Sequence, residues 1–270
     1  MKPVDTFAQV MAAFRAARQG ARDFQANLFP SPEKIETWIR RRSILNEDIG
    51  GTHLFVRRTP ELDHLYFFAP DRPSLETALG AWRTPAVAVA DVIGKGTGAE
   101  DTAACFRRAG FSLHKTLVRM FRAPVEGDTR PPEAPDVEPA LPADTAAVSS
   151  FLRAVFDPLC DQIPDEAETA EAIAAGGVWV IRERPGLAAL IHFERQGQVA
   201  QIRYWAVAAG GRNRGTGARL MRTALRLTHP RRVYLWVIQT NADAIAKYRH
   251  YGFAEDGLED RVMVRPKETS

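Results

Sequence analysis

A dense run of prolines divides this chain into two halves of similar length. Proline has no backbone N–H and a fixed φ, so such a run interrupts helices and interior strands and favours an extended linker. We therefore expect two folded parts, over residues 1–122 and 137–270, joined by a proline-rich linker at residues 123–136. The proline-dense run extends over residues 122–144 and contains Pro124, Pro131, Pro132, Pro135, Pro139 and Pro142.

A short repeat indicates that the two parts are copies of one fold. The segment FRRAGF at Phe106–Phe111 resembles YRHYGF at Tyr248–Phe253. Each segment follows a predicted strand and helix and precedes a final predicted strand. In the second half, residues 178–182, 187–193 and 199–207 are expected to be strands joined by turns short enough for antiparallel hairpins. We expect an α/β (α+β) fold of two lobes, each a mixed, mostly antiparallel sheet flanked by helices.

Helix signals are clear in several places. Ser31 followed by Pro32 predicts a helix start, with an apolar stripe that we extend to Leu45. Helices are also expected near residues 74–82, 101–108, 216–227 and 241–250. The run Gly94–Gly98 (GKGTG) is interpreted as a flexible turn.

Composition excludes several classes of protein. The chain is 45% hydrophobic and 26% charged, as in ordinary globular proteins, and no stretch approaches the roughly 20 apolar residues of a membrane span. The N-terminal segment lacks the apolar block of a secretory signal, so we expect a cytoplasmic protein without membrane contact. The net charge is +3, but basic residues are spread along the chain among acidic ones, so no nucleic-acid partner is expected. Two cysteines cannot form a four-ligand zinc site alone, and we expect no metal.

The most informative segment is a strand, loop and helix at residues 205–218. Arg212, Gly215 and Gly217 have the spacing R-x-x-G-x-G. Glycines let backbone approach a ligand closely, and a helix N-terminus attracts anions, so this segment predicts a pyrophosphate site. It lacks the lysine of a Walker A motif, and its antiparallel context differs from that of a dinucleotide fingerprint. A glycine-rich turn without a ligand is the alternative.

Downstream, the segment N-x₂-A-x₃-Y-x₃-G-F runs from Asn241 to Phe253. Together with Val207 and R-x-x-G-x-G, it resembles the Gcn5-related N-acetyltransferase (GNAT) superfamily. The resemblance implies two tandem acyl-CoA N-acyltransferase-like lobes and acetyl-CoA as co-substrate. The cofactor-binding residues that it implies are Trp205, Ala206, Val207, Arg212, Asn213, Arg214, Gly215, Thr216, Gly217, Ala218 and Asn241.

The resemblance also implies catalytic roles. Tyr248 matches the general acid that protonates the departing thiolate; a packed core aromatic is the alternative. Backbone groups at Trp205 and Val207 would lie beside the pantetheine arm. The general base stays open, because the strand before the loop has no carboxylate; His192, Glu194 or a water chain are the alternatives. Arg203, at the usual acidic position, suggests an acceptor with its own carboxylate.

The first half departs from the family pattern. Its equivalent loop, residues 69–74, has two prolines in place of N–H donors, and Phe106 stands where Tyr248 stands in the second half. We expect a degenerate first lobe and a catalytic second one. The expected activity is transfer of an acetyl group to a small-molecule primary amine in a ternary complex. Protein lysine or N-terminal acetylation and a non-catalytic acyl-CoA-binding module are the alternatives. The oligomeric state is left open.

Overall fold

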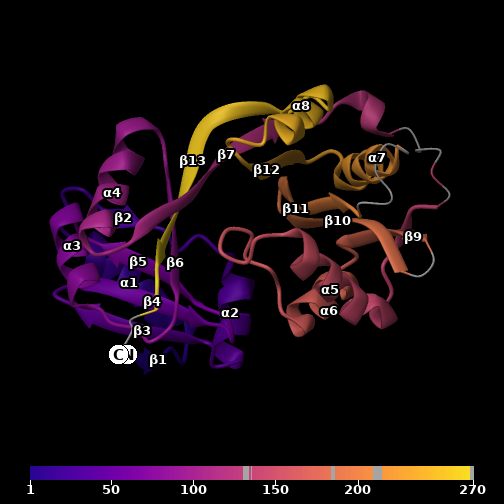
Figure 1. Cartoon of the computed structure of the whole chain (residues 1–270). Helices are drawn as coiled ribbons and strands as arrows, with labels where there is room; N and C mark the ends of the chain where they lie inside the picture. The colour runs from indigo at the N-terminus through magenta and orange to yellow at the C-terminus, as the bar shows by residue number, and fades with distance from the viewer. Residues whose placement is uncertain (130–133, 135, 184–185, 209–214, 268–270) are drawn as a thin grey trace. The chain divides into compact units, whose positions relative to one another are not determined.

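The chain folds into two compact units in a computed structural model that describes residues 1–129, 134, 136–183, 186–208 and 215–267 (Figure 1). The first unit consists of Met1–Leu117 and Gly257–Ser270, and the second of Val118–Asp256. This division differs from the expected lobes of residues 1–122 and 137–270, because the last strand pairs within the first unit.

The first unit is a sheet flanked by helices. Its strand order is β1-β3-β4-β5-β6-β13-β7. Residues 259–265 of the last strand pair antiparallel with residues 88–94, whereas β5 and β6 are parallel. The elements are β1 (Lys2–Pro3), α1 (Phe7–Arg18), β2 (Gln25–Ala26), α2 (Pro32–Arg40), β3 (Ile44–Ile49), β4 (Thr52–Arg58), β5 (Asp63–Ala69), α3 (Arg72–Ala81), β6 (Ala88–Gly94), α4 (Gly96–Arg108), β7 (Ser112–Arg122, shared with the second unit) and the end of β13 (Ala254–Arg265).

The second unit repeats this plan. Its strand order is β7-β12-β11-β10-β9-β8, in which β8 to β11 are antiparallel and β11–β12 is parallel. The elements are η1 (Glu126–Thr129), β8 (Glu138–Pro139), η2 (Pro142–Asp144), α5 (Thr145–Val155), α6 (Glu166–Ala174), β9 (Val178–Glu183), β10 (Gly186–Gln196), β11 (Val199–Val207), α7 (Thr216–Thr228), β12 (Arg232–Ile238) and α8 (Ala242–His250). The expected fold class, with a mixed and mostly antiparallel sheet in each lobe, is confirmed.

Each sheet buries apolar side chains on both faces. In the second unit, one core lies between the sheet and α7 and α8, with Leu220 and Ile245 among its members. The other lies on the side of α5 and α6 and includes Leu152 and Ile173. Burying a side chain such as Leu220 stabilises the fold by about 1.5–3 kcal/mol. These two cores fix the sheet between its helices.

Local signals located most helices, and two expectations were wrong. The Ser31 hydroxyl caps α2 by accepting from the Lys34 N–H. Leu45, which we assigned to that helix, lies in β3, because the helix ends at Arg40 and the chain reverses at Arg42, which has a positive φ of 52°. The GKGTG run is not a free turn: α4 begins at Gly96.

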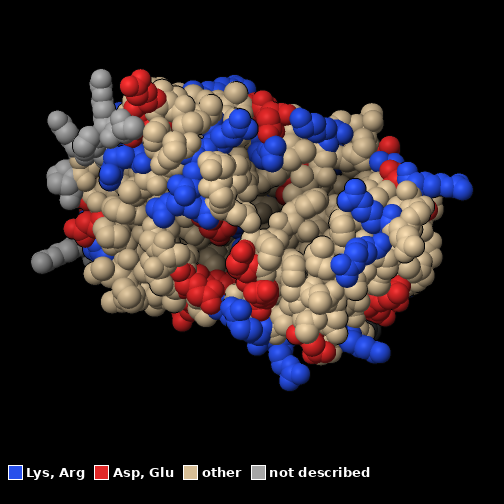
Figure 2. Space-filling model, turned by 180° about the vertical axis from the view of Figure 1, so that it is seen from behind, with Lys and Arg blue, Asp and Glu red and all other residues tan. Residues whose placement is uncertain are grey.

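The surface carries charges of both signs. On the face seen in Figure 2, lysine and arginine side chains are interspersed with aspartate and glutamate. Among the described residues, none of the helices combines the length and the hydropathy that spanning a membrane would require.

Candidate functional site

A β-bulge reorganises the second unit's central strand, β11. In the ladder with β10, Ile202 pairs with Phe193 and Tyr204 pairs with His192, so Arg203 is an extra residue. Because an inserted residue reverses the alternation of a strand, the side chains that face α7 change parity here. Ile202 packs into the core beside α7 before the bulge, and Trp205 packs against it after the bulge.

Beyond the bulge, β11 and its parallel neighbour β12 separate. Their ladder covers Val199–Ile202 and Arg232–Leu235, whereas β11 continues to Val207 and β12 to Ile238. Backbone N–H and C=O groups need partners. Residues 203–207 lie beyond the last paired residues of this ladder, so the gap, which we call the β11/β12 opening, offers backbone hydrogen-bonding groups to a ligand.

The helix that follows β11 has an open N-terminus. Gly215, with a φ of +69°, is the N-cap of α7 and makes no side-chain capping hydrogen bond, and the first turn of the helix has no acidic residue. The backbone N–H groups at a helix start and the positive end of the helix dipole suit an anion. Thr216 is buried here, and Ala218 is partly buried. Arg212, Asn213 and Arg214 lie outside the described residues.

Gly217 is required by a close aromatic neighbour. A Cβ at this position would lie 3.1 Å from Cζ2 of Trp205. The Trp205 Nε1–H donates to the Gly217 carbonyl oxygen at 3.1 Å. The glycine of the motif therefore lets the helix start pack directly on the end of β11. Ala206 and Val207 continue the strand past this contact.

Helix α8 places Tyr248 beside the same tryptophan. The ring centroids of Tyr248 and Trp205 are 5.4 Å apart, and those of Tyr248 and Phe253 are 6.0 Å apart. Tyr248 is 9% exposed, and burial, aided by the charge of Asp161, holds the pKa of its phenol well above the usual value. The phenol therefore stays protonated. At the start of α8, the Asn241 side chain caps the helix by accepting from the Ala244 N–H at 3.1 Å.

The structure adds a carboxylate that the sequence reasoning missed. Asp161 lies in the loop between α5 and α6, and the Tyr204 hydroxyl reaches the carbonyl oxygens of Asp161 and Gln162 at 2.8 and 2.9 Å. No local motif marks Asp161, because its position depends on a hydrogen bond from Tyr204, which lies 43 residues later in the chain.

The two candidate bases from the sequence, His192 and Glu194, have different environments in the structure. His192 is 5% exposed and packs against the ring of Tyr204 at 5.7 Å. Glu194 is largely exposed, and its carboxylate lies 3.9 Å from Nε of Arg203. Thus Glu194 is a solvated strand residue near the bulge, and His192 is a buried one.

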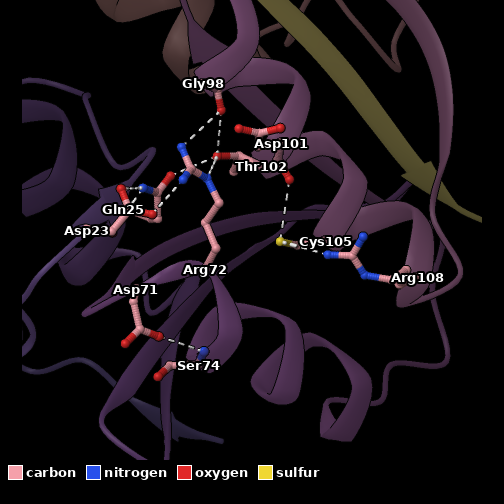
Figure 3. A network of polar contacts seen from close by, with 10 residues as sticks. All are labelled: Asp23, Gln25, Asp71, Arg72, Ser74, Gly98, Asp101, Thr102, Cys105 and Arg108. Atoms are coloured by element: carbon pink, nitrogen blue, oxygen red, sulfur yellow. Dashed lines mark hydrogen bonds and ion pairs between the residues drawn. The ribbon is translucent and has the colours of Figure 1, made fainter.

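The positions of the first unit that correspond to the α7 N-terminus and to Tyr248 carry different side chains. The Asp71 carboxylate caps α3 by accepting from the Ser74 N–H at 2.8 Å (Figure 3). A carboxylate thus covers the helix N-terminus that is open in the second unit. Phe106 is fully buried and packs between Phe67 and Phe111.

Comparison with known proteins agrees with this geometry. Residues 147–253 match the model of the acetyltransferase (GNAT) family. A search of curated proteins found no match.

Several solved structures share the fold over both units. A Gcn5-related N-acetyltransferase from Sphaerobacter thermophilus is similar with a TM-score of 0.61 and 14% identity, over 100% of this chain and 95% of that one. A tandem GNAT protein from the clavulanic acid biosynthesis pathway has a TM-score of 0.59 and 15% identity, over 100% and 98%. An acetyltransferase from the GNAT family of Colwellia psychrerythraea has a TM-score of 0.55 and 12% identity, over 98% and 99%. At these identities the likeness establishes the fold.

Proposed function

Residues 147–253 belong to the acetyltransferase (GNAT) family, in a chain with the tandem GNAT fold, and from this premise we propose an N-acetyltransferase. It transfers an acetyl group from acetyl-CoA to the primary amine of a small molecule. The amine attacks directly in a ternary complex. The observation that carries the proposal is the open N-terminus of α7 beside the β11/β12 opening, with Tyr248 buried on the neighbouring helix.

The residues present fit acetyl-CoA. Gly215, Thr216, Gly217 and Ala218 would hold the pyrophosphate through backbone N–H groups, with Arg212, Asn213 and Arg214 adding to the same loop. The pantetheine arm would lie along residues 205–207, where β11 extends past its ladder with β12, and its amides would bond to the strand's backbone. Asn241, at the start of α8, would contact the arm. The bound thioester supplies the acetyl group and a thiolate leaving group.

The reaction forms a C–N bond and breaks a C–S bond. The amine nitrogen loses a proton, and the departing sulfur gains one. Tyr248 donates the second proton, because its phenol is held in the protonated form near the opening. Backbone N–H groups of residues 205–207 stabilise the oxygen of the reacting carbonyl as negative charge develops on it.

Thiol release from acetyl-CoA, measured across a panel of amines, tests the proposal. We expect at least one small primary amine to raise thiol release well above the rate of hydrolysis. Tight binding of acetyl-CoA without any amine-dependent release would instead identify a non-catalytic binding module. If peptides are acetylated and no small amine is, the acceptor is a protein lysine or N-terminus instead.

A further inference from the structure

The carboxylate of Asp161 lies in a loop that is anchored next to the β-bulge. The Tyr204 hydroxyl holds this loop through two carbonyl oxygens, at Asp161 and at Gln162. Gln162 has a φ of 45°, in the left-handed region that non-glycine residues rarely adopt. Strained backbone of this kind persists where surrounding contacts fix it, often at functional sites. Tyr204 directly precedes Trp205, so the anchor ties the loop to the strand that borders the β11/β12 opening.

The environment of this carboxylate suits proton transfer. One of its oxygens, Oδ2, accepts from the Asp157 N–H at 2.9 Å and from the Cys160 thiol at 3.7 Å. Burial raises the pKa of Asp161, the charge of Asp157 adds to the rise, and Arg203 opposes it. A carboxylate with a raised pKa is a better general base near neutral pH. Its charge also reaches Tyr248, whose pKa it helps to raise.

We propose that Asp161 is the general base of the second unit, which accepts the proton that the attacking amine loses. This inference rests on the proposed function. The amine proton passes to the Asp161 carboxylate as the C–N bond forms, while Tyr248 protonates the sulfur as the C–S bond breaks. Tyr248 and Asp161 then exchange protons with solvent before the next turnover.

The test is the pH–rate profile of Asp161→Asn, with Glu194→Gln as the matched control. At pH 7 we expect kcat/KM of Asp161→Asn to fall by about 100-fold or more, and to recover as pH approaches about 10, where a lysine-like amine loses its own proton. Glu194→Gln keeps the wild-type profile. The acetyl-CoA dissociation constant of both variants stays unchanged.

Three results overturn the inference. An equal loss at every pH makes Asp161 a structural residue, and an unchanged profile removes it from the reaction. A pH-dependent loss in Glu194→Gln moves the role to that residue. In each case amine-dependent turnover by the wild-type protein persists, so the proposed function stands; absence of that turnover overturns both.

A second, independent observation concerns the first unit. There, too, the parallel pair separates: only Asp63 and His64 of β5 pair with Ala88 and Val89 of β6, although the strands continue to Ala69 and Gly94. The first unit therefore has an opening between β5 and β6 that corresponds to the one in the second unit.

The amide of Asn27 fills this opening. Its Nδ2 donates to the carbonyl oxygen of Leu65 on β5 at 3.1 Å and to that of Asp91 on β6 at 3.0 Å. Its Oδ1 accepts from the Phe67 N–H at 2.7 Å, and its own N–H donates to the Phe67 carbonyl oxygen at 3.3 Å. Asn27 is 3% exposed. One side chain thus satisfies backbone groups of both separated strands.

Polar contacts hold the adjoining segment in place (Figure 3). Arg72 pairs with Asp23 at 2.6 Å, and the Thr102 hydroxyl donates to Oε1 of Gln25 at 2.8 Å. Gln25, Arg72 and Thr102, together with Asn27, line a pocket of about 160 Å³. That space is small beside the roughly 300–1,000 Å³ of ordinary cofactor and drug-like ligand sites.

We infer that residues 23–27 of the chain itself occupy the opening between β5 and β6 in the first unit. Under the proposed function, Asn27 takes in this unit the place that the pantetheine arm takes in the second. Asp71 likewise covers the helix N-terminus where a pyrophosphate would bind. The chain then binds one CoA, in the second unit.

Calorimetric titration with CoA and amide hydrogen exchange test this inference. We expect one CoA per wild-type chain and none per Gly217→Trp chain. In Asn27→Ala, the Phe67 N–H exchanges at least tenfold faster, because its acceptor is gone, whereas Asn46→Ala leaves that rate unchanged. Two CoA per chain, or one retained by Gly217→Trp, overturns the inference, as does an unchanged Phe67 exchange rate in Asn27→Ala. No CoA binding by the wild-type protein refutes the proposed function, and the exchange experiment still decides the role of Asn27.

Discussion

Replacing Tyr248 with phenylalanine separates the chemistry of this residue from its packing. Among the described residues, the phenol oxygen has no hydrogen-bond partner, whereas the ring packs against Trp205 and Phe253. Tyr248→Phe keeps the ring and leaves no protein group unpaired. We therefore expect a change of less than about 1 kcal/mol in the free energy of unfolding.

The same substitution removes the proposed proton donor. General acid catalysis contributes about 10²–10⁴ to a rate, which corresponds to about 2.7–5.4 kcal/mol in the activation free energy. Steady-state thiol release measures the rate, and urea denaturation measures the stability. We expect kcat to fall by about 100-fold or more at an unchanged denaturation midpoint.

Tyr251→Phe is the matched control. Tyr251 follows the same helix, and its ring lies 6.0 Å from that of Trp205. It loses the same atom next to the same neighbour, so its rate should stay within about twofold of the wild type. A Tyr248→Phe rate within threefold of the wild type, or an equal loss in both variants, refutes the acid role of Tyr248.

Three further predictions concern binding and stability. Gly217→Val should weaken CoA binding at least tenfold in calorimetry, because its Cβ would lie 3.1 Å from the Trp205 ring; unchanged affinity would contradict the site. Asp260 has a raised pKa, caused by burial and then by the charge of Asp91, so its contribution to stability is present below about pH 4 and is lost as pH rises through the folded-state pKa. Asp260→Asn should therefore raise the urea midpoint at pH 7 but not at pH 3; a fall at pH 7 would refute this account. Although burial opposes it, Arg122 holds the pKa of Asp128 below its usual range, so this pair stabilises the fold above about pH 4 and weakens as pH falls through the lowered pKa. Asp128→Ala leaves the buried Arg122 guanidinium without its carboxylate and should cost about 2–4 kcal/mol at pH 7 and much less at pH 2, and equal costs at both pH values would exclude the ion pair as the cause.

Local sequence patterns were sufficient to predict much of the fold. Ser31 and Pro32 define a helix start through a hydroxyl cap and a fixed φ, and both effects act within one turn. Position 217 of the R-x-x-G-x-G motif is glycine because a Cβ there would lie too close to the Trp205 ring. Leu45 was misassigned because its spacing from the apolar residues of α2 also suits a helix, and only the chain reversal at Arg42 decides otherwise.

The sequence by itself determined the tandem α/β architecture and the residues of the helix motif, because these depend on short-range periodicity, caps and spacing. Only the tertiary structure decided which distant groups meet. Tyr204 holds a loop 43 residues earlier, and Asn27 bonds to a strand 64 residues later. The end of β13 pairs with β6 in the first unit, although the residues that precede it in the chain belong to the second unit. Such contacts have no period in the chain, because they are selected by the requirement that every buried backbone and side-chain polar group finds a partner.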